Sequence, residues 1–318
     1  MQKNNIMKEI AIVIPAYKAQ FFRHTLESLA HQSCKNFTLY IGDDASPDDF
    51  ESLVSIYKKD IDIVYKKFDN NLGGKDLVAQ WKRCIEMTKG EPWIWLFSDD
   101  DILGPNCIRL LLDELTKQSQ KDIYHFNVSV IDEYNNVVRK VKRFPTIISS
   151  KELFIKKESA TIESFVVEYI FSRDIYDKVG GFQEFDLAWG SDITTWVKMG
   201  NDRGIKTIEG DEVFWRSSSL NITTNLNKSM VYRKFRASLD YMVFVNDFFK
   251  DADIISFNLK NFYRLLFHYS NILDIDQLKF IIKMAFEKNI ISHRMGALMS
   301  KTLHLTIFLK RIKVLLIK

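Results

Sequence analysis

Cysteine, proline and glycine are all scarce in this 318-residue chain, which contains 3, 5 and 12 of them. The odd number and scattered positions of Cys34, Cys84 and Cys107 disfavour a disulfide framework and favour reduced thiols. No apolar run reaches the ~20 residues that span a bilayer. The N-terminal MQKNNIMKEI lacks the apolar region and cleavage site of a signal peptide. We therefore expect a cytoplasmic protein.

Several kinds of binding site are also missing from the sequence. The net charge of +4 is too small to indicate a dedicated nucleic-acid-binding protein, so we expect no nucleic-acid partner. No G-x-x-x-x-G-K-[ST] phosphate loop exists, because Lys75 is followed by Asp76. No G-x-G-x-x-G follows the first apolar run, which disfavours a dinucleotide-binding dehydrogenase. The six histidines show no zinc spacing.

What the sequence does contain is a regular alternation of two patterns. Apolar, β-branched or aromatic runs predict strands at 9–15, 37–41, 61–65 and 92–97. Segments with helical spacing follow them at 22–31, 50–57, 77–87 and 106–117. This alternation predicts an α/β protein with a mostly parallel sheet and helices on both faces.

The rest of the chain divides into a shorter mixed part and a helical part. A strand pair is expected at 122–131 and 136–142, a strand at 164–173, and a helix through 191–199. Residues 204–216 suggest two short strands around Gly210. From about 229 onward the pattern is helical, so we expect a catalytic domain at 1–226 and a helical region at 227–318. That helical region could form a homodimer, contact a membrane or shape a groove, and the sequence leaves these open.

Three consecutive carboxylates, Asp99, Asp100 and Asp101, follow the fourth predicted strand. Ligands of open α/β sheets bind at the carboxyl ends of the strands. Carboxylates this close repel one another unless a cation or a set of donors holds them. The triplet therefore suggests a divalent metal with a phosphorylated ligand, and the alternative is a solvated acidic turn before the next helix.

The last segment, Leu305–Lys318, projects as a basic amphipathic helix. This pattern is typical of an in-plane anchor on anionic lipid, which favours a contact with the inner face of the plasma membrane. The alternative is a terminal helix packed on the body of the protein with a solvated basic face.

A set of short motifs now supports a comparison. In chain order they are IVIPAYKA, LESLAHQS, IGDDASPDD, FSDDDILGP, VGGFQE, WGSDITTWVKMG and FWRSSSLNIT. Together they resemble the family 2 glycosyltransferases, inverting enzymes of the GT-A fold that use nucleotide-diphospho-sugars. The resemblance covers roughly 8–224 and not the helical tail. Any one of these motifs is weak evidence, and the ordered set is strong.

The resemblance implies a role for several positions. The residues expected to bind the nucleotide-sugar are Pro15, Ala16, Tyr17, Asp44, Gly73, Lys75, Asp99, Asp100 and Arg216. Asp100 and Asp101 would hold Mn²⁺ or Mg²⁺, Asp192 would be the catalytic base, and Trp189 and Gly181 would lie at the acceptor.

The sequence departs from the family pattern at three places. Ser98 stands where the first Asp of the DxD motif is expected, Ser191 replaces the usual Glu before the base, and the usual histidine near Arg216 is absent.

Residue chemistry alone leaves alternatives at most of these positions. Asp192 could be an ordinary acid at a helix N-terminus, stabilised by the helix dipole. Tyr17 and Trp189 could be core aromatics, and Lys75 a solvated loop lysine. Oxygen ligands without a nearby His or Cys cluster favour Mg²⁺ or Mn²⁺ over zinc.

We expect an inverting, metal-dependent glycosyltransferase of the hexosyl or N-acetylhexosaminyl type. A UDP-sugar is the favoured donor, with GDP and dTDP left open, and the acceptor would be a hydroxyl of a glycan or lipid-linked glycan in bacterial surface polysaccharide synthesis. One alternative is a non-catalytic sugar-nucleotide-binding subunit, which Ser98 and Ser191 keep open. Another is a sugar-nucleotide nucleotidyltransferase, although its Gly-rich basic loop after the first strand is missing here.

Overall fold

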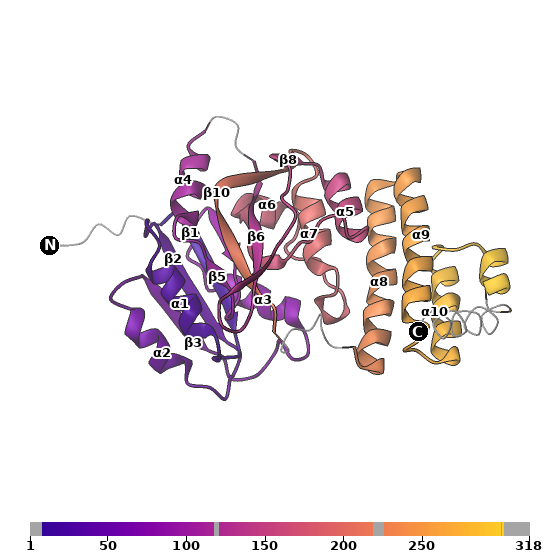
Figure 1. Ribbon diagram of the computed structural model, residues 1–318, viewed down its shortest axis with the longest axis horizontal. Coiled ribbons are helices and arrows are strands. Elements are labelled where there is room, and N and C mark those ends of the chain that lie inside the picture. The colour runs from indigo at the N-terminus through magenta and orange to yellow at the C-terminus, as the bar shows by residue number, and fades with distance from the viewer. Residues whose placement is uncertain (1–7, 118–120, 219–225, 300, 302–318) are drawn as a thin grey trace. The chain divides into compact units, whose positions relative to one another are not determined.

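The computed structural model describes residues 8–117, 121–218, 226–299 and 301, and it divides into two compact units (Figure 1). The first unit contains the described residues up to Glu184 and those from Ser191 to 218. The second contains Phe185–Gly190 and the described residues from 226 onward.

Strands and helices alternate through the first unit. The strands are β1 Ile10–Ala16, β2 Phe37–Asp43, β3 Ile63–Lys67, β4 Trp93–Leu96, β5 Ile102–Leu103, β6 Ile123–Ile131, β7 Val137–Lys140, β8 Ile147–Ile148, β9 Tyr169–Ser172 and β10 Ile205–Arg216. The helices are α1 Phe22–Ala30, α2 Phe50–Tyr57, α3 Leu77–Ile85, α4 Cys107–Leu115, α5 Ser150–Glu158, α6 Arg173–Lys178 and α7 Ser191–Met199, with short 3₁₀ turns η1 Val166–Glu168 before β9 and η2 Asp186–Ala188 in the second unit.

One sheet forms the centre of the first unit, in the order β3-β2-β1-β4-β9-β6-β10-β5. β1 pairs in parallel with β2 and β4, and β2 pairs in parallel with β3. β9 is antiparallel to both β4 and β6, whereas β6 and β10 are parallel. The expected α/β class with a helix-flanked sheet is confirmed. The antiparallel insertion of β9 makes the second half of the sheet mixed, and a pattern of alternating elements does not reveal strand direction.

Apolar side chains of the parallel strands are buried on both faces, which explains why β1 is a continuous apolar run. Ile10, Ile12 and Ile14 pack into the core that holds Phe22 of α1 and Phe50 of α2. Successive side chains of a strand alternate between faces. The intervening Ala11 and Val13 are also buried, and α3 contacts β1.

The carboxyl ends of β1, β2 and β4 lie at one edge of the sheet. The register pairs Ala16 of β1 with Asp43 of β2, and the amide of Phe97, just after β4, donates to Val13 O at 2.8 Å. The loops that leave these strands carry Tyr17, Asp44 and the acidic triplet. This edge is therefore where the candidate site is assembled.

Two expectations about the later strands were wrong. Residues 204–216 form the single strand β10, because its pairing with β6 continues across a register shift between Ile208 and Glu212. The expected strand at 164–173 is confined to β9, and the residues before it form η1. The short elements α5, β5 and β8 were not expected.

The second unit contains three long helices, α8 Lys228–Phe249, α9 Ala252–Tyr269 and α10 Ile275–Glu287. Asn227, Asp251 and Asp274 cap their N-termini with side-chain oxygens. Across the described ranges no helix is both long and apolar enough to cross a membrane. The predicted amphipathic segment 305–318 lies outside the described residues.

Candidate functional site

The acidic triplet is fastened to the end of β1. Asp99 Oδ2 accepts hydrogen bonds from the amides of Tyr17 and Lys18, at 2.7 and 2.8 Å. The two loops are thus joined by a carboxylate between adjacent backbone donors, although they are far apart in the sequence. Desolvation and the neighbouring Asp100 raise the pKa of Asp99 to about 6.

Asp100 and Asp101 differ in accessibility. Asp100 is half-buried and accepts a hydrogen bond from the Ser98 hydroxyl, whereas Asp101 is buried and accepts one from the Arg216 amide at 2.6 Å. Desolvation raises the pKa of both carboxyls, that of Asp101 well above its ordinary value. The structure therefore gathers carboxyl groups whose charged forms are costly here, and a bound cation would relieve that cost.

Ser98 occupies the position where the family motif has an aspartate. Its hydroxyl donates to Asp100 and accepts from the Asp100 amide at 3.2 Å. Ser98 thus orients the next carboxylate without adding a negative charge to the loop.

Arg216, expected to cover the diphosphate, has internal partners. Its guanidinium donates to Asp100 O, Asp132 O and Asn135 Oδ1, at 2.7, 2.6 and 2.7 Å. The residue is fully buried, and its guanidinium carbon lies 4.5 Å from the centre of the Phe21 ring. In this arrangement Arg216 ties the end of β10 to the acidic loop, and contact with a diphosphate stays a prediction.

Asp44 organises the loop after β3. Its carboxylate oxygens accept from the amides of Leu72 and Gly73, at 2.7 and 2.8 Å, and it forms an ion pair with Arg83. A side chain at position 73 would place its Cβ 2.8 Å from Asp44 Oδ2, so this close approach requires glycine. Asp43, by contrast, accepts from the Ser46 amide and the Tyr65 hydroxyl.

The residues expected at the nucleotide base lie beside this loop. The Asp44 amide donates to Ala16 O at 2.9 Å, which joins the ends of β1 and β2. Tyr17 is 41% exposed, so it is not the core aromatic of the alternative interpretation. Pro15 is half-buried within β1, and Lys75 is exposed in the loop before α3.

The carboxylates fit a metal whose coordination is completed by a ligand. Among the described residues, no group of three His, Cys, Asp or Glu side chains could hold a metal ion by itself. Mg²⁺ is usually bound by one or two carboxylates together with substrate phosphates and water, and it does not need an all-protein cage. The desolvated pair Asp100 and Asp101 suits that kind of site.

Asp192 lies in the first turn of α7, where it is half-buried. Desolvation raises the pKa of its carboxyl, the nearby Lys157 opposes that shift, and Glu158 adds to it. A base of raised pKa holds a proton more tightly than an ordinary aspartate does. Ser191 before it is fully buried, and its carbonyl accepts from the Thr195 hydroxyl at 2.6 Å.

A buried polar pair lies close enough to Asp192 to feel its charge. His125 Nε2 and Glu168 Oε1 are 3.4 Å apart, and both side chains are about 1% exposed. Desolvation lowers the pKa of His125 to about 3 and raises that of Glu168 well above its usual range, with the charge of Asp192 contributing to the latter. At neutral pH the His125 imidazole is therefore neutral, and burial disfavours the charged form of Glu168 beside it.

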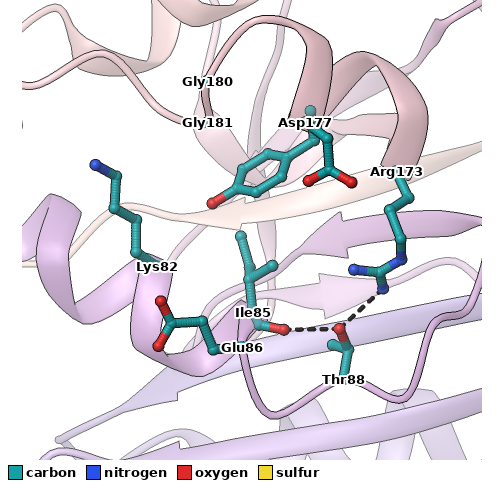
Figure 2. A pocket seen from close by; sticks show the side chains of 9 residues that line it. Lys82, Ile85, Glu86, Thr88, Arg173, Asp177, Gly180 and Gly181 are labelled. Atoms are coloured by element: carbon teal, nitrogen blue, oxygen red, sulfur yellow. Dashed lines mark hydrogen bonds between the residues drawn. The ribbon is translucent and has the colours of Figure 1, made fainter.

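Gly181 lines a cavity of about 410 Å³ on the first unit. Figure 2 shows Lys82 of α3 and Glu86, the residue after that helix, across this cavity from Asp177, Gly180 and Gly181, with Arg173 at one side. Arg173 donates to the Thr88 hydroxyl at 2.8 Å and to Glu91 O at 2.9 Å. The lining mixes hydrogen-bond donors and acceptors in the way that a hydroxyl-rich ligand needs.

Trp189 belongs to the second unit, where it packs on α8. Its Nε1 donates to Ser238 Oγ at 3.1 Å, and Lys234 Nζ lies 4.9 Å from the ring centre. These contacts give the indole a packing role, and an acceptor contact stays a prediction.

Three features of the site were not found from the sequence. Arg83 forms an ion pair with Asp44. Lys18 donates its amide to Asp99, and its charge lowers the pKa of that carboxyl. The charge of Lys157 lowers the pKa of Asp192. Each lies far from its partner along the chain, so no local pattern marks it. Only the PAYK turn, with Lys18 directly after Tyr17, contained a usable signal.

The family follows from a comparison with known proteins. Residues 11–180, more than half of the chain, match the family model described as Glycosyl transferase family 2. The chain belongs to this family.

Two relatives illustrate the similarity. An uncharacterized glycosyltransferase of Rickettsia prowazekii is 28% identical over 204 residues, 63% of this chain and 61% of the relative. The GalNAc(5)-diNAcBac-PP-undecaprenol beta-1,3-glucosyltransferase of Campylobacter jejuni is 22% identical over 232 residues, 71% of each protein. The match thus spans about three fifths of the Rickettsia protein.

Solved structures of S. aureus TarS residues 1–349 share the fold. The complex with UDP-GlcNAc has a TM-score of 0.57 at 12% identity, covering 93% of this chain and 91% of that one. The complex with UDP gives a TM-score of 0.55 with the same identity and coverage. At this identity the likeness concerns the fold alone, and it confirms the expected GT-A architecture with a C-terminal helical region.

Proposed function

We propose that this chain is an inverting glycosyltransferase that moves a hexose or N-acetylhexosamine from a UDP-sugar to a hydroxyl of a glycan or lipid-linked glycan. The observation that carries the proposal is the shared sheet edge, where Asp99 binds the amides after β1 and Asp44 shapes the loop after β3. The UDP and UDP-GlcNAc in the TarS structures support a uridine nucleotide as donor. The undecaprenol-linked name of the Campylobacter relative supports a lipid-linked acceptor.

The donor would lie along this edge. Pro15, Ala16 and Tyr17 would contact the base, with Tyr17 stacking on it, and Asp44 would accept from a base N–H. Lys75 and the Gly73 loop would face the phosphates, with Arg216 behind the acidic loop. Asp100 and Asp101 would hold Mn²⁺ or Mg²⁺, which neutralises the diphosphate as it leaves.

Asp192 would perform the proton transfer. Its carboxylate takes the proton from the acceptor hydroxyl as the oxygen bonds to the anomeric carbon from the opposite face of the sugar. The bond between that carbon and the diphosphate oxygen breaks, and the diphosphate keeps the electron pair. The configuration at the anomeric carbon is thereby inverted.

The acceptor would extend past Gly181 into the cavity in Figure 2. An acceptor contact of Trp189 is a separate prediction. We assign residues 1–226 to catalysis and 227–318 to acceptor shaping, dimer formation or membrane contact. The reaction would take place in the cytoplasm, at the inner face of the plasma membrane if segment 305–318 binds lipid. This would place the chain in bacterial surface polysaccharide synthesis.

The test is a panel of nucleotide-sugars assayed for hydrolysis and transfer with and without Mn²⁺, comparing the wild type with Asp100→Ala and Asp192→Asn. We expect one donor to support transfer, with loss on chelation and in both variants. Normal turnover by Asp192→Asn would refute the base assignment. A wild-type chain that binds UDP but never forms product would favour the non-catalytic binding subunit.

A further inference from the structure

The far side of the cavity in Figure 2 lies at the opposite edge of the sheet from the acidic loop. Arg173 lines that side, and its amide donates to Pro92 O, just before β4, at 2.8 Å. Its guanidinium donates to the carbonyl of Glu91 at 2.9 Å. The acidic loop follows the other end of β4, and the four residues of this strand alone span ~13 Å. A sugar unit at the far side of the cavity is therefore too distant to react at the acidic loop.

The near side of the cavity is joined to the helix of the proposed base, and all of these contacts lie within the first unit. Gly181 lines the cavity, and Gln183, two residues later, donates its amide to Thr195 Oγ1 at 2.9 Å. Thr195 follows Asp192 by three residues on α7, about 4.5 Å along the helix axis. The cavity therefore starts close to α7 and extends toward the start of β4.

Packing on two helices holds the segment between the cavity and α7. The ring of Phe182 lies 5.2 Å from that of Trp81 on α3 and 5.6 Å from that of Trp196 on α7. Glu184 forms an ion pair with Lys82 of α3. Because these contacts are already made without a ligand, the cavity is formed in advance, as small-molecule sites usually are.

The charges of the lining favour a ligand that donates hydrogen bonds. Glu86 and Asp177 are exposed carboxylates, and neither forms an ion pair with another described residue. The two cations of the lining, Lys82 and Arg173, both have carboxylate partners. The charge that is left without a partner is therefore negative. It suits sugar hydroxyls, which donate to carboxylates in strong hydrogen bonds, and it repels an anionic ligand.

Tyr176 adds a donor to this lining. Desolvation, together with the charges of Glu86 and Asp177, raises the pKa of Tyr176 to about 12, so its hydroxyl stays protonated at neutral pH. The volume of about 410 Å³ lies in the range of small-molecule sites. Donors and acceptors around a space of this size fit a neutral sugar unit with several free hydroxyls.

We propose that the cavity is a distal acceptor subsite, so that the acceptor is an oligosaccharide. One sugar unit presents the reacting hydroxyl to Asp192, and another, uncharged unit of the same glycan occupies the cavity between Glu86 and Asp177. This inference rests on the proposed function of Asp192 as the base. It excludes a uronic acid or a phosphorylated sugar from the distal position.

The first test measures binding to an array of neutral hexose and N-acetylhexosamine glycans, from monosaccharides to longer oligosaccharides, with UDP and Mn²⁺ present. Matched glycans that contain a uronic acid are included. We expect neutral oligosaccharides to bind more tightly than monosaccharides and more tightly than the acidic glycans. Asp177→Ala should weaken oligosaccharide binding about tenfold, since a hydrogen bond to a charged group contributes at least about 1.5 kcal/mol. Asp174→Ala is the control, because Asp174 is also an exposed acid of α6 but does not line the cavity.

The second test measures transfer to the oligosaccharide that binds best. We expect Glu86→Ala to raise the KM for this acceptor about tenfold, with kcat and the KM for donor at wild-type values. This split follows because a distal subsite contributes equally to binding of the ground state and of the transition state. Asp174→Ala should have the wild-type KM for acceptor.

The outcomes separate this inference from the proposed function. Transfer to a monosaccharide with the same kcat/KM as to its oligosaccharides would overturn the distal subsite alone. Wild-type oligosaccharide binding by both Asp177→Ala and Glu86→Ala would also overturn it, as would a parallel loss of UDP binding in these variants. If the wild type transferred no sugar, the proposed function would fail, and array binding would still decide whether the cavity holds a neutral glycan.

Discussion

Asp192 lies in the first turn of α7, where the helix dipole favours the ionised carboxylate, but burial of its side chain disfavours that ionised form. Desolvation is the larger effect and raises the pKa of its carboxyl above the ordinary value near 3.9. A base works only when deprotonated, so activity is lost as the pH falls through this raised pKa. We expect the acid limb of the kcat/KM profile to lie at a higher pH than that of an ordinary aspartate. A limb at or below about 4 would contradict this assignment.

Two neighbours of Asp192 should move that limb in opposite directions. Lys157 stabilises the carboxylate and Glu158 destabilises it. Lys157→Met should therefore shift the acid limb to higher pH, and Glu158→Gln should shift it to lower pH. The pair form an ion pair with each other at 2.8 Å, so each change also frees the opposing charge and reinforces its effect. Parallel shifts in both variants would point to another titrating group.

The ion pair of Asp44 and Arg83 gives a prediction about stability. Their side chains are 5% and 18% exposed, so Arg83→Met would leave a buried carboxylate with fewer donors. We expect a loss of about 1.5–3 kcal/mol in the free energy of unfolding, measured by urea denaturation. Arg109→Met is the control, since its pair with Asp113 is 49% and 61% exposed and should contribute below about 0.5 kcal/mol. Equal losses in the two variants would show that the Asp44–Arg83 pair contributes no more to stability than an exposed ion pair does.

At the scale of elements, β1, β2 and β4 could be predicted because burial on both faces produces unbroken apolar runs. The edge of the sheet was also predictable, since parallel strands end together and their polar loops follow directly. The direction of β9 could not be predicted, because strand pairing depends on contacts between segments distant in the chain. The partners of Asp44 could not be predicted either, because they also lie far from it along the chain. The burial of Arg216 could not be predicted because arginine usually lies at the surface.

Arg216 connects two elements, the end of β10 and the loop after β4. Arg216→Met would leave Asp100 O, Asp132 O and Asn135 Oδ1 without their donor. We expect a loss of about 3–5 kcal/mol in the free energy of unfolding, because each buried acceptor left without its donor costs about 1–3 kcal/mol. Urea denaturation measures this, and the KM for donor is the companion readout. Unchanged stability with a raised KM would instead support direct contact with the diphosphate.

At the scale of the whole molecule, the nucleotide edge lies within one compact unit and the three long helices lie in the other. A ligand stabilises only the folded state that binds it, by about 2.7 kcal/mol at a hundred times its Kd. UDP with Mn²⁺ should therefore raise the melting temperature of the first unit by about 5–10 °C. Calorimetry checks this, with UDP alone, Mn²⁺ alone and Asp100→Ala as controls. Asp100 is the more accessible carboxylate of the proposed metal pair. In Asp100→Ala, UDP and Mn²⁺ together should therefore raise the melting temperature no more than either ligand does alone. If UDP alone gave the full shift in wild type and variant alike, the nucleotide would bind without the metal, and the acidic loop would have a structural role only.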